Sequence, residues 1–269
     1  MKTLKRIAAG ILSTALLLGM TSCAAKETET SADANVDAAA AFTTVESGKL
    51  IMATNAFFPP YEYYEGDKIV GIDVEIATAV ADKLGLELVI EDVEFDSIIA
   101  GVQSGKYDIG CAGMTVTEDR LKSVNFSTPY ATGIQSIIVA ADSEITDIDT
   151  LVSGDYKVGV QSGTTGDIYM TEEVGEDRIE RFAKGNDAII ALTSGKISAV
   201  VIDNEPAKAF VAANDGLKIL ETPYTIEDYA MAINKDNVAL KDAINQALKE
   251  LTDDGTIAAI VNKYIPAEG

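Results

Sequence analysis

The sequence of 269 residues contains no histidine, no tryptophan, six prolines and two cysteines, Cys23 and Cys111. The absence of histidine excludes histidine-based metal sites and catalytic triads that need an imidazole, and the separation of the cysteines excludes a CxxC redox motif. We therefore expect no metal ion and no cofactor, and a small, buried, unreactive Cys111. Basic residues are also scarce: 21 lysines and arginines stand against 43 aspartates and glutamates, a formal charge of -22. A surface of this sign repels nucleic acid.

The first 22 residues have the pattern of an export signal. Residues 1–6 carry three basic side chains, and residues 7–20 form an apolar run that is short for a membrane span. The run ends in the letters MTSC, which resemble a bacterial lipobox and so imply cleavage before Cys23 and attachment of lipid to it. The alternative is an ordinary secretory peptide with an incidental cysteine. We expect an extracytoplasmic protein anchored to the cell membrane through Cys23.

Residues 23–44 consist mostly of alanine, threonine, serine, aspartate and glutamate. Such a segment has too little apolar surface to pay for its own ordering, so it is predicted to be a flexible linker.

From Gly48 onward the sequence alternates between strand-like and helix-like patterns, which is typical of an α/β protein. Gly85 is expected to end a helix that begins after Gly71, and Asp96 is expected to cap the next helix. Residues 55–62 are predicted to be a loop rich in aromatic side chains. Further strands are predicted at 49–54, 86–93, 134–140, 156–160, 199–202, 217–220 and 229–234, and further helices at 205–214, 239–253 and 256–264.

The stretch from 108 to 130 combines a buried strand, a break at Gly113 and a polar helix start. Thr117 is the expected N-cap, which places Arg120 at the third helical position. The helix dipole disfavours a cation there unless an anion lies in front of it, so we predict that Arg120 and nearby backbone N–H groups bind a carboxylate. The alternative is a surface arginine paired with Glu118 or Asp119.

Two segments of the chain resemble each other. The letters DSIIAGVQSGK at 96–106 match DAIIALTSGK at 187–196 with one residue fewer, and each reads as a helix followed by a strand. Two lobes of similar construction around a shared cleft explain this repeat, although chance similarity of two helix–glycine–strand units is the alternative. The glycine-rich turn at 161–166 lacks a Walker lysine and a GxGxxG pattern, which disfavours phosphate binding.

Seven motifs in order resemble the family-3 extracellular solute-binding proteins, the polar amino-acid receptors of ABC importers. They are FFPPYEY, GIDVEIA, FDSIIAGVQSGKYD, GMTVTEDR, NFSTPY, VGVQSGTTG and VVIDNEPA. The resemblance implies a type II periplasmic-binding-protein fold, with two α/β lobes joined by two crossing strands. The expected division is lobe 1 at 45–134 and 229–269, and lobe 2 at 135–228.

The resemblance also implies ligand contacts. Gly113, Thr115 and Arg120 are expected to bind the ligand carboxylate from lobe 1, and Thr164 and Thr165 are expected to add donors from lobe 2.

Asp203 is expected to accept hydrogen bonds from the ligand's α-ammonium, the alternative being a surface N-cap of the following helix. Phe58 and Phe95 are expected to be apolar walls of the cleft, or else plain core aromatics. Asn55 and Gln161 occupy positions where family members select the ligand side chain, although Gln161 could instead face solvent.

Two positions depart from the family pattern. Ala230 stands where a glycine is frequent, which is expected to stiffen the hinge, and Phe57 stands where relatives often have a polar residue, which leaves a contact at the cleft rim in doubt.

The expected function is a monomeric, non-catalytic receptor that binds a polar amino acid and delivers it to a membrane-embedded ABC permease. Because Asn55 and Gln161 are neutral, glutamine, cystine and basic amino acids all remain open as ligands. A ligand sensor for a membrane signalling partner is one alternative. A hydro-lyase of the same fold is the other, and it would need a cleft acid with a shifted pKa.

Overall fold

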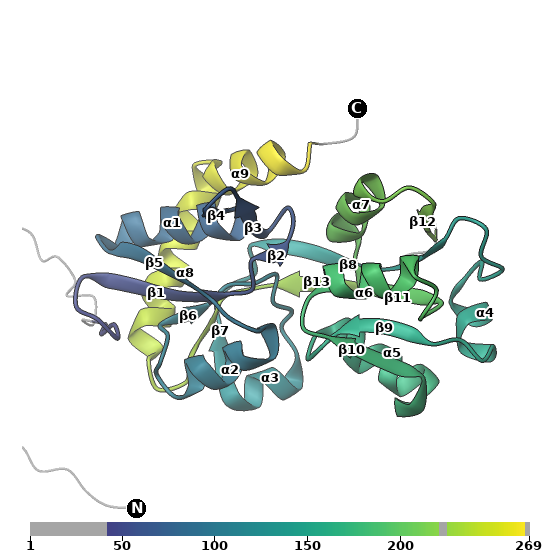
Figure 1. The fold of residues 1–269 in the computed structure, drawn as a ribbon. Coiled ribbons are helices and arrows are strands. Elements are labelled where there is room, and N and C mark those ends of the chain that lie inside the picture. Colours follow the sequence, from purple (N-terminus) through teal and green to yellow (C-terminus); the bar gives the residue numbers. More distant parts are fainter. Residues whose placement is uncertain (1–41, 221–224, 267–269) are drawn as a thin grey trace, which may run out of the picture. The chain divides into compact units, whose positions relative to one another are not determined.

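The computed structural model describes residues 42–220 and 225–266. Cys23, the export signal and most of the predicted linker lie outside the described residues. Two sheets flanked by helices make up most of the described part (Figure 1), together with a small third sheet.

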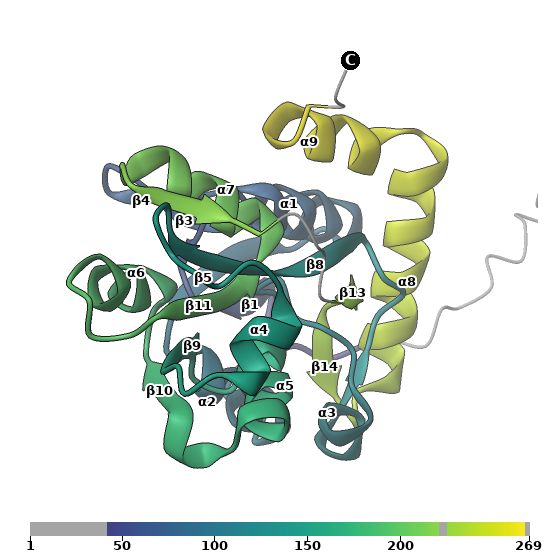
Figure 2. The same ribbon diagram turned by 90° about the vertical axis from the view of Figure 1, so that its right-hand side faces the viewer.

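The first sheet has the strand order β5-β1-β6-β14-β7. Strand β1 (Lys49–Thr54) pairs in parallel with β5 (Glu87–Asp92) and β6 (Ile109–Gly110), while β14 (Ala232–Asn234) is antiparallel to β6 and β7 (Val124–Phe126). Its helices are α1 (Ile72–Leu84), α2 (Phe95–Gln103), the short α3 (Glu118–Ser123), α8 (Val238–Asp253) and α9 (Thr256–Tyr264). Helix α8 contacts α1, α9 and β14, and Figure 2 shows α8 and α9 in yellow at the edge of this half.

The second sheet has the order β10-β9-β11-β8-β12. Strands β10 (Ile179–Phe182), β9 (Val158–Gln161) and β11 (Ala199–Asp203) are parallel, whereas β8 (Ala131–Ala140) is antiparallel to β11, β12 (Leu217–Ile219) and β13 (Thr225–Tyr229). Its helices are α4 (Ile148–Ser153), α5 (Thr165–Val174), the 3₁₀ turn η1 (Glu176–Arg178), α6 (Gly185–Thr193) and α7 (Asn204–Ala213). The chain passes between the two sheets after β7 and again after β13.

The two sheets are built along the same path. One runs β1-α1-β5-α2-β6 and the other runs β9-α5-β10-α6-β11, each starting at an inner strand, moving to the edge and returning to the other side. The matching segments of the sequence are α2 and α6, which occupy equivalent places in these paths. The prediction of two similarly built lobes is therefore confirmed.

The apolar pattern explains why these elements form where they do. In α1 the buried apolar residues recur at helical spacing, and Gly85 ends the helix in the left-handed conformation at φ 69°. In β1 the residues from Leu50 to Ala53 are all buried, as expected for an inner parallel strand covered on both faces. Burial of each large aliphatic side chain contributes about 1.5–3 kcal/mol, so the packing of helices on both sheets stabilises each lobe.

Three local predictions are wrong. The strand predicted at 229–234 is divided, because β13 ends at Tyr229 in the second sheet and β14 begins at Ala232 in the first. Residues 55–62 are not only a loop, because β2 (Phe57–Phe58) and β3 (Glu62–Glu65) pair and continue into β4 (Lys68–Val70) as a small antiparallel sheet. Asp96 does not cap α2: the cap position is Glu94, and Asp96 lies in the first turn. The Asp96 carboxylate instead accepts a hydrogen bond from Ser162 Oγ at 3.1 Å, a tertiary contact that replaces the local one.

Within residues 42–220 and 225–266, no helix has both the length and the apolar character that a membrane crossing requires.

Candidate functional site

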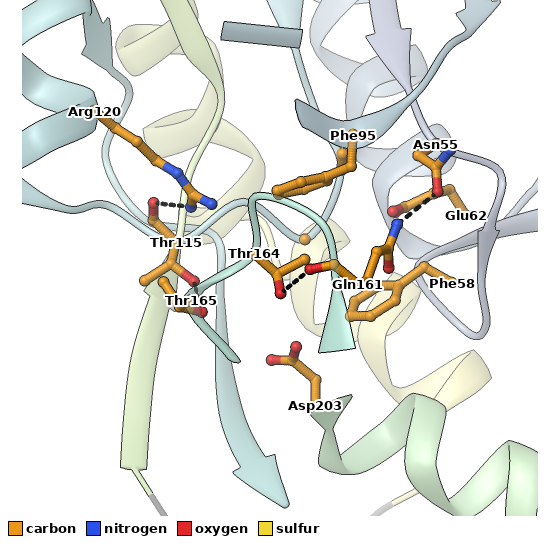
Figure 3. Close-up of a pocket in the computed structure, with 12 residues that line it drawn as sticks. Asn55, Phe58, Glu62, Phe95, Thr115, Arg120, Gln161, Thr164, Thr165 and Asp203 are labelled. Carbon is orange, nitrogen blue, oxygen red and sulfur yellow. Dashed lines mark hydrogen bonds between the residues drawn. The ribbon is translucent and has the colours of Figure 1, made fainter. Parts of the chain in front are cut away.

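One cavity is bordered by all ten residues predicted to contact a ligand (Figure 3). Glu62 and Ala112 complete its lining. The ten are Asn55, Phe58, Phe95, Gly113, Thr115, Arg120, Gln161, Thr164, Thr165 and Asp203.

The cavity lies at the carboxyl ends of parallel strands from both sheets. Asn55 follows β1, and Gly113 follows the break after β6. Gln161 is the last residue of β9, and Asp203 is the last residue of β11. Open parallel sheets bind ligands at this edge, because side chains and backbone N–H groups beyond the strand ends are not used by the sheet itself.

Arg120 reaches this cavity from the start of α3. Its backbone N–H donates to Thr117 Oγ1 at 3.2 Å, which confirms the predicted N-cap. The guanidinium donates from Nη1 to the Thr115 carbonyl at 2.7 Å and from Nη2 to the Gly163 carbonyl at 3.0 Å.

The Arg120 side chain is 9% exposed and forms no salt bridge with a described residue. The alternative of a surface ion pair is wrong, because Asp119 pairs with Lys122 instead. The guanidinium also lies 5.3 Å from the centroid of the Phe95 ring, a cation–π contact, and Phe95 itself lines the cavity.

Asp203 is the last residue of the buried strand β11, and it lines the cavity while remaining 7% exposed. Tyr229 Oη donates to Oδ1, and Gln135 Nε2 donates to Oδ2 at 2.9 Å. Burial raises the pKa of Asp203 to about 7, the charge of Glu227 acts in the same direction, and the two donors oppose the rise. Asp203 occupies the cap position of α7, but its side chain makes no cap bond among the described residues, so the surface N-cap alternative is wrong.

Gln161 and Asn55 are bonded to each other across the two lobes. Gln161 Nε2 donates to Asn55 Oδ1 at 2.9 Å and to the Ala183 carbonyl at 3.2 Å, while Asn55 Nδ2 donates to the Val93 carbonyl at 2.7 Å. Gln161 is buried, so the alternative of a solvent-facing side chain is wrong.

The two threonines at the start of α5 have different partners. Thr164 is the N-cap: its Oγ1 accepts from the Asp167 N–H at 3.3 Å and donates to the Gln161 carbonyl at 2.8 Å. Thr165 Oγ1 donates to Glu227 Oε2 at 3.0 Å and lies 3.5 Å from Thr115 Oγ1 across the lobes.

At Gly113 the backbone lies close to the Phe58 ring, and the Gly113 N–H is not a free hydrogen-bond donor. Its φ is +52°, and a Cβ there would lie 2.8 Å from the Phe58 ring, so a side chain would disturb the aromatic wall. Its N–H donates to Asp73 Oδ2 at 2.7 Å, which means that this N–H already has a protein acceptor.

Sequence reasoning missed Glu62, which lines the cavity and is 1% exposed. It also missed the polar groups around Asp203: Gln135 Nε2 donates to both Asp203 and Glu227 at 2.9 Å, and Glu227 Oε1 accepts from Tyr169 at 2.9 Å. The signal for Glu62 was a carboxylate inside the aromatic motif FFPPYEY. Glu227 could have been found as an acidic residue at a strand position whose side chain points to the buried face.

No group of acidic or cysteine side chains suited to a metal ion occurs in the described part of the chain.

Comparisons with known proteins identify the family to which the chain is similar. The family model for bacterial extracellular solute-binding proteins, family 3, matches residues 50–267. The arginine-binding extracellular protein ArtP of Bacillus subtilis is 35% identical over 235 residues, which cover 83% of this chain and 89% of ArtP.

Solved structures match at similar levels. An ancestral arginine-binding protein bound to glutamine is 38% identical with a TM-score of 0.77, and the match covers 81% of this chain and 98% of the other. The arginine-, lysine-, histidine-binding protein ArtJ of Geobacillus stearothermophilus is 32% identical with a TM-score of 0.77, covering 82% and 96%. These matches confirm the predicted two-lobe fold, and the names of the relatives, all binding proteins, confirm the prediction that the chain is not an enzyme.

Proposed function

Because the chain belongs to the bacterial extracellular solute-binding proteins of family 3, we propose that it captures an arginine-type amino acid between its lobes and presents it to an ABC importer. The observation that carries the proposal is that Arg120 and Asp203, a cation and an acid from different lobes, border one cavity.

An α-amino acid satisfies both of these charges at once. Arg120 has two backbone carbonyls as partners and no described carboxylate, so it retains capacity to bind a ligand carboxylate. Asp203 has two neutral donors, and an α-ammonium would favour its ionised form. Plain amines and plain carboxylic acids each leave one buried charge unpaired, and the site should therefore reject them.

A cationic side chain is favoured by Glu62. This carboxyl group is buried in the lining of the cavity, and its Oε2 atom has no hydrogen-bond partner among the described residues. The relatives that are named for arginine, lysine or histidine binding support the same ligand class.

Closure of the lobes around the ligand follows from the contacts between them. The proposed lobes are residues 45–134 with 229–269, and residues 135–228. Three hydrogen bonds join these two sets of residues: Gln161–Asn55, Arg120–Gly163 and Ser162–Asp96. A ligand that binds both lobes favours the closed arrangement by its contacts to both.

For localisation, we keep the proposal of a lipid anchor on Cys23 after removal of residues 1–22, with residues 23–44 as the tether and the receptor acting as a monomer. The family description supports an extracellular location, and the MTSC letters support the anchor.

A ligand panel tests the proposed function. Thermal unfolding of the full chain is measured with arginine, lysine, ornithine, histidine, citrulline, glutamine and cystine, followed by calorimetry with the best ligand. A ligand at a hundred times its dissociation constant stabilises the folded state by about 2.7 kcal/mol. Stabilisation by arginine above the neutral amino acids is expected, and no stabilisation by any amino acid would refute the proposal.

A further inference from the structure

Glu62 has a second buried carboxyl group as its neighbour. Glu62 lies in β3 and Asp73 in the first turn of α1, and their side chains are 1% and 0% exposed. The backbone N–H of Asp73 donates to the carbonyl of Tyr61, the residue before Glu62, at 2.9 Å, so Asp73 and Glu62 are neighbours. Glu62 is the member that lines the cavity (Figure 3).

The described hydrogen-bond donors around this pair contact only one oxygen of Asp73. Asp73 Oδ2 accepts from the Gly113 N–H and from Tyr130 Oη, both at 2.7 Å. Asp73 Oδ1 and Glu62 Oε2 have no N–H or O–H partner within the described residues. Two ionised carboxylates would repel each other and leave both oxygens unsatisfied, whereas one proton between them satisfies both.

The surroundings of the pair hold no compensating cation. Tyr61 on the segment before β3, Cys111 after β6 and Tyr130 before β8 are neutral at neutral pH, since burial raises the pKa of each. Asp203 at the end of β11 is a further acid that faces Glu62. Within residues 42–220 and 225–266, no lysine or arginine forms a salt bridge with either carboxyl group, and the one cation in the cavity lining, Arg120, bonds backbone carbonyls.

The donors decide which carboxyl group carries the proton. Burial raises the pKa of both, but the Gly113 and Tyr130 donors counteract the rise at Asp73, while the neighbouring Asp73 charge raises the pKa of Glu62 further. Because the pair is coupled, the proton belongs to the pair, with Glu62 as its main holder.

We propose that Glu62 and Asp73 share one proton, and that an amino acid with a cationic side chain expels this proton when it binds, whereas a neutral side chain leaves it in place. The inference rests on the proposed function of the cavity. In the step, the Glu62 O–H bond breaks and the proton passes to the solvent buffer. The pair changes from one negative charge to two, and the ligand cation supplies the compensating charge.

The shared proton makes side-chain selectivity depend on pH. In the protonated state Glu62 offers a neutral group to the ligand, which suits an uncharged side chain. As the pH rises toward the range where the pair ionises, a smaller fraction of the protein holds the shared proton, so the cationic ligand displaces a proton less often. The affinity ratio of arginine to citrulline, its uncharged analogue of similar shape, should then increase by up to about tenfold per pH unit.

Calorimetry of the full chain tests the proposal with arginine and citrulline in two buffers of different ionisation enthalpy. Asp203 can also lose a proton when the α-ammonium binds, but that loss is common to both ligands and cancels in their difference. We expect arginine to release up to about one proton more than citrulline below the pH at which the pair ionises, and the affinity ratio to rise with pH. Equal proton release for the two ligands, with a pH-independent ratio, would overturn the proposal.

Glu62→Gln fixes the protonated form, and Glu65→Gln, an exposed position on the same strand, is its control. Glu62→Gln should remove the excess proton release and flatten the pH dependence of the ratio while citrulline still binds, and Glu65→Gln should behave as wild type. Excess release that persists in Glu62→Gln would assign the proton to another group and refute the pair. If that variant does not fold, the wild-type comparison decides alone. Failure of every amino acid to bind would refute the proposed function, a result distinct from binding without the excess proton.

Discussion

The side-chain amide of Gln161 donates a hydrogen bond to the side-chain carbonyl of Asn55 at 2.9 Å, from the end of β9 in one lobe to the turn after β1 in the other. Each amide has a backbone carbonyl as a further acceptor, Ala183 for Gln161 and Val93 for Asn55. The pair therefore holds the two strand ends together at the edge of the cavity, and it is buried.

Loss of this pair should weaken ligand binding. Gln161→Leu leaves the buried Asn55 carbonyl without its donor, at a cost of about 1–3 kcal/mol, so affinity for arginine should fall by about five- to a hundredfold. Ser162→Ala removes a more exposed contact between the lobes and is the control, with an expected loss below about threefold. Calorimetry measures both, and an unchanged affinity for Gln161→Leu would show that the pair does not support closure.

Arg120 and Asp203 should each be essential for recognising the zwitterion. Arg120→Ala should weaken binding by at least about a hundredfold, and Arg120→Lys should restore little because an ammonium cannot form the bidentate contact. Asp203→Asn should impair binding without unfolding the protein. Lys122→Ala, an exposed cation on the same short helix, is the control. Affinities within threefold of wild type for Arg120→Ala and Asp203→Asn would place the site elsewhere.

The raised pKa of Asp203 predicts a pH effect on stability without ligand. The native carboxyl titrates near 7 and the unfolded one near 3.8, so between these values the folded state binds more protons and stability falls as the pH rises. Chemical unfolding from pH 4 to 8 should show wild type losing roughly 1–4 kcal/mol relative to Asp203→Asn across this range. A constant difference between the two proteins would contradict the raised pKa.

Gly163 and Gly195 form a matched pair of glycines with φ of +74° and +72°. A Cβ at Gly163 would lie 2.8 Å from Asp96 Cβ in the other lobe, whereas nothing lies within 4 Å of a Cβ at Gly195. Alanine at either position should cost about 1 kcal/mol in stability through backbone strain. Only Gly163→Ala should also weaken arginine binding, by about tenfold or more, because it obstructs the closed arrangement. Equal affinities for the two variants, measured by calorimetry, would exclude a closure contact at Gly163.

The anchor proposal predicts that wild-type protein partitions with membranes in a bacterial host and that Cys23→Ser is released or remains unprocessed. Fractionation and intact mass measurement provide the readout. Cys111→Ser, at the buried cysteine, should leave partitioning unchanged. Wild-type protein that is wholly soluble and free of lipid would refute the anchor.

The sequence by itself determined the alternation of helices and strands and the resemblance of α2 to α6, and its resemblance to the motifs of the family implied ten of the twelve residues that line the cavity. These features depend on local patterns: apolar periodicity, glycine positions and short motifs that lie at strand ends. Parallel strands bring their carboxyl ends to one edge, so motifs at those ends meet without any detailed knowledge of the packing.

Only the tertiary structure decided how these side chains are partnered. Glu62 with Asp73, Gln161 with Asn55, and Gln135 with Asp203 are pairs that no local pattern links, and the last two pairs are 106 and 68 residues apart in the chain. Asp96 illustrates the reason, because its side chain fits the local rule for a helix cap, yet it bonds Ser162 of the other lobe. Such contacts depend on chain closure and on the packing of both lobes, which set the burial, and with it the charge state, of each carboxyl group.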